Sequence, residues 1–131
     1  IVDNKAICSL SFPVLTTIGG YDFDIYNNSN LTSINFPLLT NIKDINATYN
    51  SKLAFIGLPS LTSIINNYVG FNNNALPSSQ INSILNKFLT ITPATGKSVN
   101  LSNQTPPAPP TGQGIIDKQT LSNAGNSVST D

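Results

Sequence analysis

Three aspartates, Asp22, Asp24 and Asp44, fall in two short alternating segments, "DFDIY" and "DINATY". Carboxylates on one face supply the oxygen ligands that Ca²⁺ takes in sets of about six to eight. A pair of carboxylates is also the acid–base apparatus of glycoside hydrolysis. The sequence has no ligand-dense loop of the EF-hand kind and no segment that encloses the three acids. Solvated surface carboxylates are therefore the favoured interpretation, with Lys43 as a neighbour that offsets their repulsion.

Composition disfavours most other chemistry. The 131 residues include no histidine, which removes the commonest general acid–base group and the commonest metal ligand. The six lysines are scattered, arginine is absent and the net charge is zero, whereas a nucleic-acid groove needs clustered cations. No apolar run reaches the roughly 18 residues of a membrane span. The sequence thus predicts no enzyme, metal or cofactor, no nucleic-acid partner and no direct membrane insertion.

Aromatic residues accompany the aspartates at the ends of the alternating segments. Aromatic side chains cover a large area with few torsions to freeze, and amides or carboxylates beside a ring can bind sugar hydroxyls. We therefore predict a recognition surface for a protein or a glycan, formed by Asp24, Tyr26, Asn46, Tyr49, Tyr68 and Phe71. Lys97, Ser98, Asn100 and Ser102 are expected to extend it. The alternative is that the rings only pack across neighbouring strands and stabilise a sheet.

The elements that position these side chains follow from a repeat. Asn28, Asn50 and Asn72 lie 22 residues apart, and Ile25, Ala47 and Val69 keep the same spacing. A fixed period of about 20–30 residues is typical of a solenoid, whose coils stack their apolar rows into one core. The alternation within each unit predicts half-buried strands, which pair in parallel from coil to coil.

The periodic asparagines have a predicted structural role of their own. A buried amide carries donors and an acceptor, so it can bond the backbone groups of a turn and the amide of the next coil. We expect such a ladder to contain Asn28, Asn50, Asn72 and Gln104. The alternative is that these are surface residues of an asparagine-rich chain.

The spacing also carries a family resemblance. The pattern Ile42-x-x-Ile45-x-Ala47-x-x-Asn50-x-x-Leu53 resembles the leucine-rich repeat, L-x-x-L-x-L-x-x-N-x-x-L. The segments "IGGYDFDIYNNSNLTSINFPLLTNI" and "VNLSNQTPPAPPTGQGIIDKQTLSNAGNSVSTD" look like those of leucine-rich-repeat proteins from Bacteroidota surfaces and their phages. The resemblance implies a solenoid with a parallel concave sheet and a mostly extended convex side. It also implies an extracellular setting, on a virion or a bacterial cell surface.

Two regions are expected along the chain. Residues 1–75 are predicted to be repeats, with an incomplete first coil that is continued upstream or by a partner. Residues 76–131 are predicted to be helix-containing capping repeats. In "LPSSQINSILNKFLT", Ile81, Ile84, Leu85 and Phe88 follow helical spacing after an N-cap at Ser78 or Ser79. A second short helix in "IIDKQTLSNAG" is expected to stop at Gly125.

These expectations combine into one functional hypothesis. The chain is predicted to be a non-enzymatic recognition or adhesion module, in a phage tail or adsorption apparatus, that binds a host-surface protein or glycan. Two alternatives stay open. One is a bacterial cell-surface adhesin, and the other is a structural or decorating element that contacts neighbouring subunits of a larger assembly.

Overall fold

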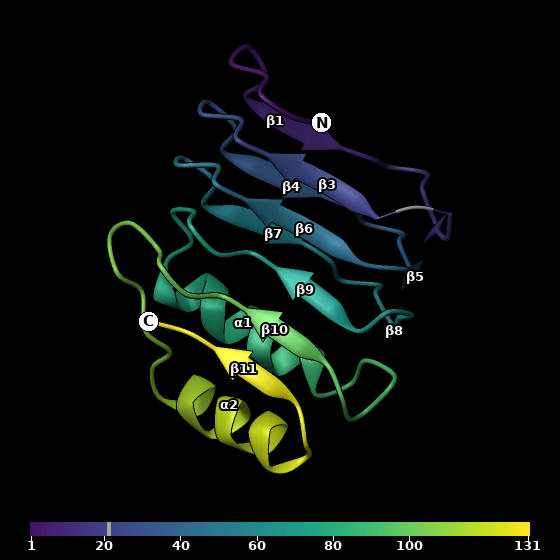
Figure 1. Ribbon diagram of the computed structural model, residues 1–131, viewed down its shortest axis with the longest axis vertical. Coiled ribbons are helices and arrows are strands. Elements are labelled where there is room, and N and C mark those ends of the chain that lie inside the picture. Colours follow the sequence, from purple (N-terminus) through teal and green to yellow (C-terminus); the bar gives the residue numbers. More distant parts are fainter. Residues whose placement is uncertain (21) are drawn as a thin grey trace.

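The computed structural model describes residues 1–20 and 22–131, which form three parallel sheets and two short helices (Figure 1). The five-stranded sheet has the order β11-β10-β9-β6-β3, and the two three-stranded sheets have the orders β1-β4-β7 and β2-β5-β8. The strands of the first are β3 (Phe23–Tyr26), β6 (Ile45–Thr48), β9 (Tyr68–Gly70), β10 (Ser98–Asn100) and β11 (Ser127–Ser129). Those of the others are β1 (Ser9–Ser11), β4 (Ser33–Asn35), β7 (Phe55–Gly57), β2 (Thr17–Ile18), β5 (Asn41–Ile42) and β8 (Ser63–Ile64).

The chain visits the sheets in turn, so that strands far apart in sequence become neighbours. We call the stretch from one strand of the five-stranded sheet to the next a coil. Phe23 pairs with Ile45, 22 residues later, and Ile34 pairs with Ile56 at the same spacing. Ile45 then pairs with Val69, and Val69 with Val99. The coil length therefore changes from 22 to 24 and then to 30 residues.

One hydrophobic core runs between the sheets. Residues at alternate strand positions turn inward, and Ile25, Ala47, Val69 and Val99 are all buried. The core continues past the sheet β1-β4-β7 and into both helices as one cluster that reaches Leu121. This is the period-two burial that the sequence predicts for half-buried strands.

In the later coils, helices take the place of the strands of the sheet β1-β4-β7. Helix α1 (Ser78–Phe88) buries Ile81, Ile84, Leu85 and Phe88, as the helical spacing predicts. Its N-cap is Pro77 and not Ser78 or Ser79, and the Pro77 carbonyl accepts the first helical hydrogen bonds. A proline at this site has no N–H to leave unsatisfied.

Helix α2 (Gln113–Asn123) packs beside α1. Its C-cap is Ala124, and Gly125 follows with φ 85°, which is the left-handed stop that the sequence predicts. The N–H of Asn126 bonds back to the Leu121 carbonyl at 3.1 Å and closes the last turn.

Candidate recognition surface

A buried series of amides fixes the turn that follows each strand of the five-stranded sheet. Asn50 Oδ1 accepts from the backbone N–H of Asn28 at 2.9 Å, and Asn50 Nδ2 donates to the Ile25 and Thr48 carbonyls at 3.0 and 3.1 Å. Asn28 repeats this with the N–H of Asn4 at 3.0 Å. Both Asn28 and Asn50 are fully buried. The amide ladder therefore satisfies backbone groups that have left the sheet.

The next member of the ladder is Asn74, and the prediction of Asn72 was wrong. Asn74 Oδ1 accepts from the Asn50 N–H at 2.9 Å, and Asn74 is buried whereas Asn72 is partly exposed. The cause is the longer coil before β9: two extra residues precede Tyr68, so the pairing of β6 with β9 has an offset of 24. The same spacing separates Asn4 from Asn28.

Gln104 takes the following position, as the sequence predicts. Its Oε1 accepts from the Leu76 N–H at 3.0 Å, and its Nε2 donates to the Phe71 and Leu101 carbonyls at 2.9 and 3.0 Å. The Asp131 carboxylate then accepts from the Gln104 N–H at 3.1 Å. Sequence reasoning missed Asp131, because an acidic side chain does not match the amide pattern.

The residue before each amide of the ladder is left-handed. Five residues share this backbone conformation, with φ between 54° and 58°: Asp3, Asn27, Tyr49, Asn73 and Asn103. Asn and Asp tolerate positive φ better than other residues with a side chain. Tyr49 is therefore the exception in a position that is otherwise Asn or Asp.

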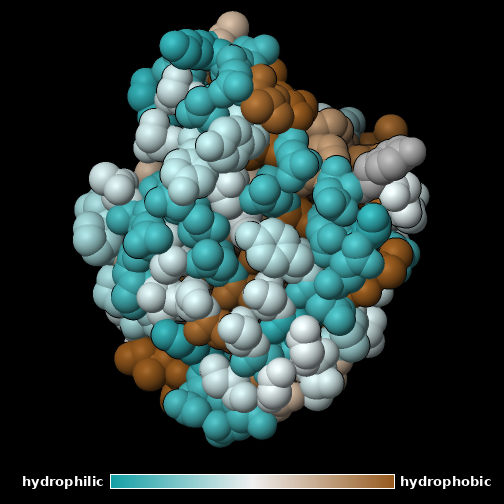
Figure 2. Space-filling view, viewed as in Figure 1, coloured by the Kyte–Doolittle hydropathy of each residue, from teal (hydrophilic) through white to brown (hydrophobic). Residues whose placement is uncertain are grey.

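Tyr49 contacts Tyr26 on the outward side of the five-stranded sheet. The ring centroids are 5.3 Å apart in an edge-to-face arrangement, and the two side chains are 51% and 38% exposed. We call the outward side chains of Asp24, Tyr26, Asn46, Tyr49 and Tyr68 the tyrosine face. Figure 2, which views the molecule from the side on which Figure 1 shows this sheet, has mainly hydrophilic colours across its middle and hydrophobic colours mostly towards the margins.

Tyr68 joins this face in a different register from the predicted one. A constant 22-residue spacing would align Tyr68 with Asp24 and Asn46, but Gly70 occupies that position and pairs with Asn46. A Cβ on Gly70 would lie 2.7 Å from the Tyr68 hydroxyl and 3.0 Å from Asn46 Oδ1. The bare glycine thus lets the tyrosine lie across the strand, beside Asn46.

Asn46 and Asp24 form the polar part of the tyrosine face. Asn46 Nδ2 donates to Asp24 Oδ1 at 3.1 Å, while Asn46 Oδ1 is buried and has no hydrogen-bond partner among the described residues. The pair presents carboxylate and amide groups next to exposed rings, as the sequence predicts for these two residues.

Two expected surface residues are instead buried. Phe71 is 0% exposed, because the 24-residue offset moves it to the inward position that corresponds to Ala47. Lys97 is also buried, and its Nζ donates to the Ile91 and Pro93 carbonyls. Desolvation by this burial lowers the pKa of Lys97 below its ordinary value of 10.5. Ser98, Asn100 and Ser102 remain partly or fully exposed.

The aspartates are separate surface groups. Lys43 Nζ lies 3.4 Å from Asp22 Oδ1, the neighbour relation that the sequence predicts. The Asp44 carboxylate is already hydrogen-bonded, because it accepts from Asn66 Nδ2 and from the Tyr68 N–H, both at 3.1 Å. Over residues 1–20 and 22–131, no three His, Cys, Asp or Glu side chains come together in a way that could hold a metal ion.

The fold and this surface define a class only in coarse terms: a parallel, mostly β chain with two short helices and exposed tyrosines on its largest sheet. Within the part of the chain that the structure describes, no helix has the length and apolar character needed to cross a membrane. Comparisons with protein-family models, curated proteins and solved structures found no match.

Proposed function

We propose that this chain is a short leucine-rich-repeat solenoid that serves as a non-enzymatic recognition module, and that its tyrosine face binds a protein or a glycan. The setting that we propose is extracellular, on a phage tail or adsorption apparatus that contacts the host surface. A bacterial adhesin would use the same face. The parallel coils and the amide ladder support the repeat assignment, because each coil closes its turn on an amide at the asparagine position of the family pattern.

The observation that carries the binding proposal is the backbone of Tyr49. Its φ of 57° is unfavourable for an aromatic residue by roughly 1–3 kcal/mol, and the four equivalent positions hold Asn or Asp. Contact with Tyr26 returns about 0.5–1.5 kcal/mol of this cost. Because half of the Tyr49 side chain stays in solvent, core packing does not account for it. An exposed aromatic residue in a backbone conformation that disfavours it is best explained by a ligand.

The chemistry of the face fits a glycan or a polar protein loop. The exposed rings of Tyr26 and Tyr49 offer apolar faces that stack against a sugar ring or an apolar side chain. The Asp24 carboxylate is exposed beside these rings and accepts from Asn46 Nδ2 through Oδ1, so its other oxygen is available to ligand hydroxyl groups. Asn46 Oδ1 is buried beside Tyr68 and lacks a partner among the described residues, so it accepts a ligand hydrogen bond only when the Tyr68 side chain moves aside.

The test is Tyr49→Asn, which gives this turn the residue type found in the equivalent ones. The probes are arrayed bacterial surface polysaccharides and immobilised outer-membrane proteins. We expect the variant to lose at least about tenfold in affinity, the effect of about 1.4 kcal/mol, while its free energy of unfolding stays the same or rises. The control is Leu38→Asn, because Leu38 is also half-exposed but lies outside the tyrosine face. Unchanged binding in a Tyr26→Ser, Tyr49→Asn double variant would refute the proposal.

A structural role is the second candidate, and it is favoured by the apolar surface of the segment before β3. Val2 and Val14 are 53% and 83% exposed, which suits a contact with a neighbouring subunit. Hydroxyl-radical footprinting of the assembled particle separates the two candidates. A structural element shows Val2 and Val14 protected in the assembled particle. A receptor-binding module keeps its tyrosines reactive until it meets the receptor and loses that reactivity when the receptor is bound.

A further inference from the structure

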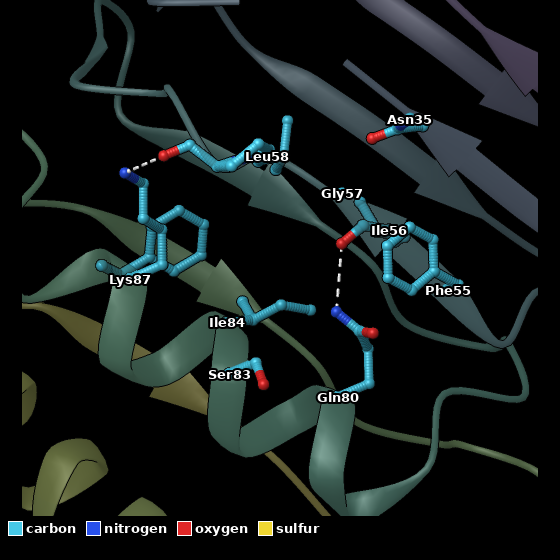
Figure 3. A pocket seen from close by; sticks show the side chains of 11 residues that line it. Asn35, Phe55, Ile56, Gly57, Leu58, Gln80, Ser83, Ile84 and Lys87 are labelled. Atoms are coloured by element: carbon cyan, nitrogen blue, oxygen red, sulfur yellow. Dashed lines mark hydrogen bonds between the residues drawn. The ribbon is translucent and has the colours of Figure 1, made fainter. Parts of the chain in front are cut away.

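A groove of about 320 Å³ lies between β7 and α1, away from the tyrosine face (Figure 3). Its floor and walls are mainly apolar, with Phe55, Ile56, Leu58 and Ile84 among the lining residues. We call it the strand groove. None of its lining residues belongs to the five-stranded sheet, so this groove is independent of the surface proposed above.

The strand groove exists because a sheet stops and a helix follows. β7 is the last strand of the sheet β1-β4-β7, and the next coil supplies α1 at the corresponding place. A paired strand would lie about 4.8 Å from β7, whereas a helix is about 10–12 Å across with its side chains and keeps its axis farther away. The side chains of α1 fill only part of the difference.

A further strand would pair with the edge of β7 in parallel, as β7 itself pairs with β4. Gln80 Nε2 of α1 donates to the Ile56 carbonyl at 3.0 Å, in the place of a backbone N–H from a further strand. One coil earlier, the equivalent Ile34 pairs with β7 itself. Figure 3 shows Gln80 reaching this carbonyl across the groove, with Ile84 farther along the helix. The Ile56 carbonyl is therefore satisfied by one flexible side chain, which the backbone N–H of an extended segment can replace.

A cation marks one end of the strand groove. Lys87 Nζ donates to the Pro59 carbonyl at 2.8 Å, and within residues 1–20 and 22–131 the only ion pair is Lys43–Asp22. One coil earlier, the Pro37 carbonyl accepts from the hydroxyl of Ser60, 23 residues later. A strand added to β7 would bring the residue that corresponds to Ser60 next to Lys87. An acidic residue there would pair with the ammonium group.

We propose that the strand groove binds an extended peptide segment of another protein. The segment pairs in parallel with β7, places an apolar side chain between Ile56 and Ile84, and sets a carboxylate on Lys87. The groove favours a peptide over a general apolar ligand. Its unpaired sheet edge hydrogen-bonds to a peptide backbone, and Lys87 pairs with an acidic side chain.

The probe is a peptide that copies residues 31–38 of this chain, with both ends blocked and with Leu38→Glu. Residues 31–38 contain β4, whose place in the sheet is one strand before β7. The charge-reversed control carries Leu38→Lys. Binding is measured by fluorescence anisotropy, and the site is mapped by ¹H–¹⁵N correlation spectra of the full chain.

We expect the Glu peptide to bind at least about tenfold more tightly than the Lys peptide, with shift changes confined to residues 55–59 and 80–88. Lys87→Gln should reduce that preference to less than about threefold, whereas Lys5→Gln, at an exposed lysine before β3, should leave it intact. Ser83→Trp, an exposed helix position on the groove, should abolish binding, and Gln119→Trp, on the outside of α2, should not.

Three results would overturn the proposal. The first is equal affinity for the two peptides, and the second is a set of shift changes at the free edge of β1. The third is self-association of the protein alone, measured by light scattering and removed by Ser83→Trp, because the occupant would then be a second copy of this chain.

Discussion

Replacing Asn74 with alanine removes one amide from the buried ladder and leaves its neighbours in place. Asn74 Oδ1 accepts from the Asn50 N–H at 2.9 Å, and its Nδ2 donates to the Ala47 and Phe71 carbonyls at 2.6 and 2.9 Å. The Phe71 carbonyl keeps a second donor, Gln104 Nε2, at 2.9 Å. The substitution therefore leaves two backbone groups without a partner, the Asn50 N–H and the Ala47 carbonyl.

The magnitude follows from these two groups. An unsatisfied buried donor or acceptor costs about 1–3 kcal/mol, so Asn74→Ala should lower the free energy of unfolding by about 2–6 kcal/mol. A domain of this size has about 5–15 kcal/mol in total. Asn72→Ala is the matched control, because Asn72 is partly exposed and its side chain makes no hydrogen bond to any described residue. Its effect should stay within about 0.5 kcal/mol.

Urea unfolding followed by far-UV circular dichroism measures both variants, with equal slopes as the check that the same surface is exposed. A larger loss for Asn72→Ala than for Asn74→Ala would refute the assigned register. In that event Phe71 would also return to the outward side of the sheet.

Three further predictions concern single residues. Phe71→Ala should cost about 3–5 kcal/mol of unfolding free energy as a buried large-to-small change, and Tyr68→Ala should cost less than half as much in the same urea assay; equal losses would contradict the assigned burial. Because burial lowers the pKa of Lys97 in the folded state, the unfolded state binds more protons between the lowered pKa and 10.5, so stability should rise with pH across that window. Lys97→Met should remove this rise in urea titrations at successive alkaline pH values, and an unchanged pH dependence would contradict it. Gly70→Ala should push the Tyr68 ring away from Asn46, which would shift the Tyr68 ring resonances in NMR spectra while the unfolding free energy changes by less than about 1 kcal/mol.

The geometry of the 22-residue coils could be predicted from the periodic residues, because spacing and alternation are local properties of the sequence. Asn28 and Asn50 are ladder residues, and Ile25 and Ala47 face the core, as their 22-residue spacing predicts. The exposed position of Tyr26 follows from the same alternation. These features depend on one rule, applied where the coil length is constant.

The prediction failed where the coil length changes. Asn72, Asn73 and Asn74 are consecutive and identical in type, so residue chemistry could not choose among them. The choice is made by packing, since burying Phe71 requires the 24-residue offset. The spacing of Asn4 to Asn28 was the available signal. The strand groove was beyond sequence reasoning, because it depends on the distance between a sheet edge and a helix.

Every amide of the ladder reaches back to groups made earlier in the chain. The Asn28 N–H gains its hydrogen-bond partner only when Asn50 has been added, 22 residues later, and the Leu76 N–H only when Gln104 has been added, 28 residues later. At a synthesis rate of about 5–20 residues per second, each turn of the nascent chain remains open for about 1–6 s. Growth on the ribosome therefore moves a single unfinished coil along the molecule, and the Gln104 turn closes only when Asp131 has emerged.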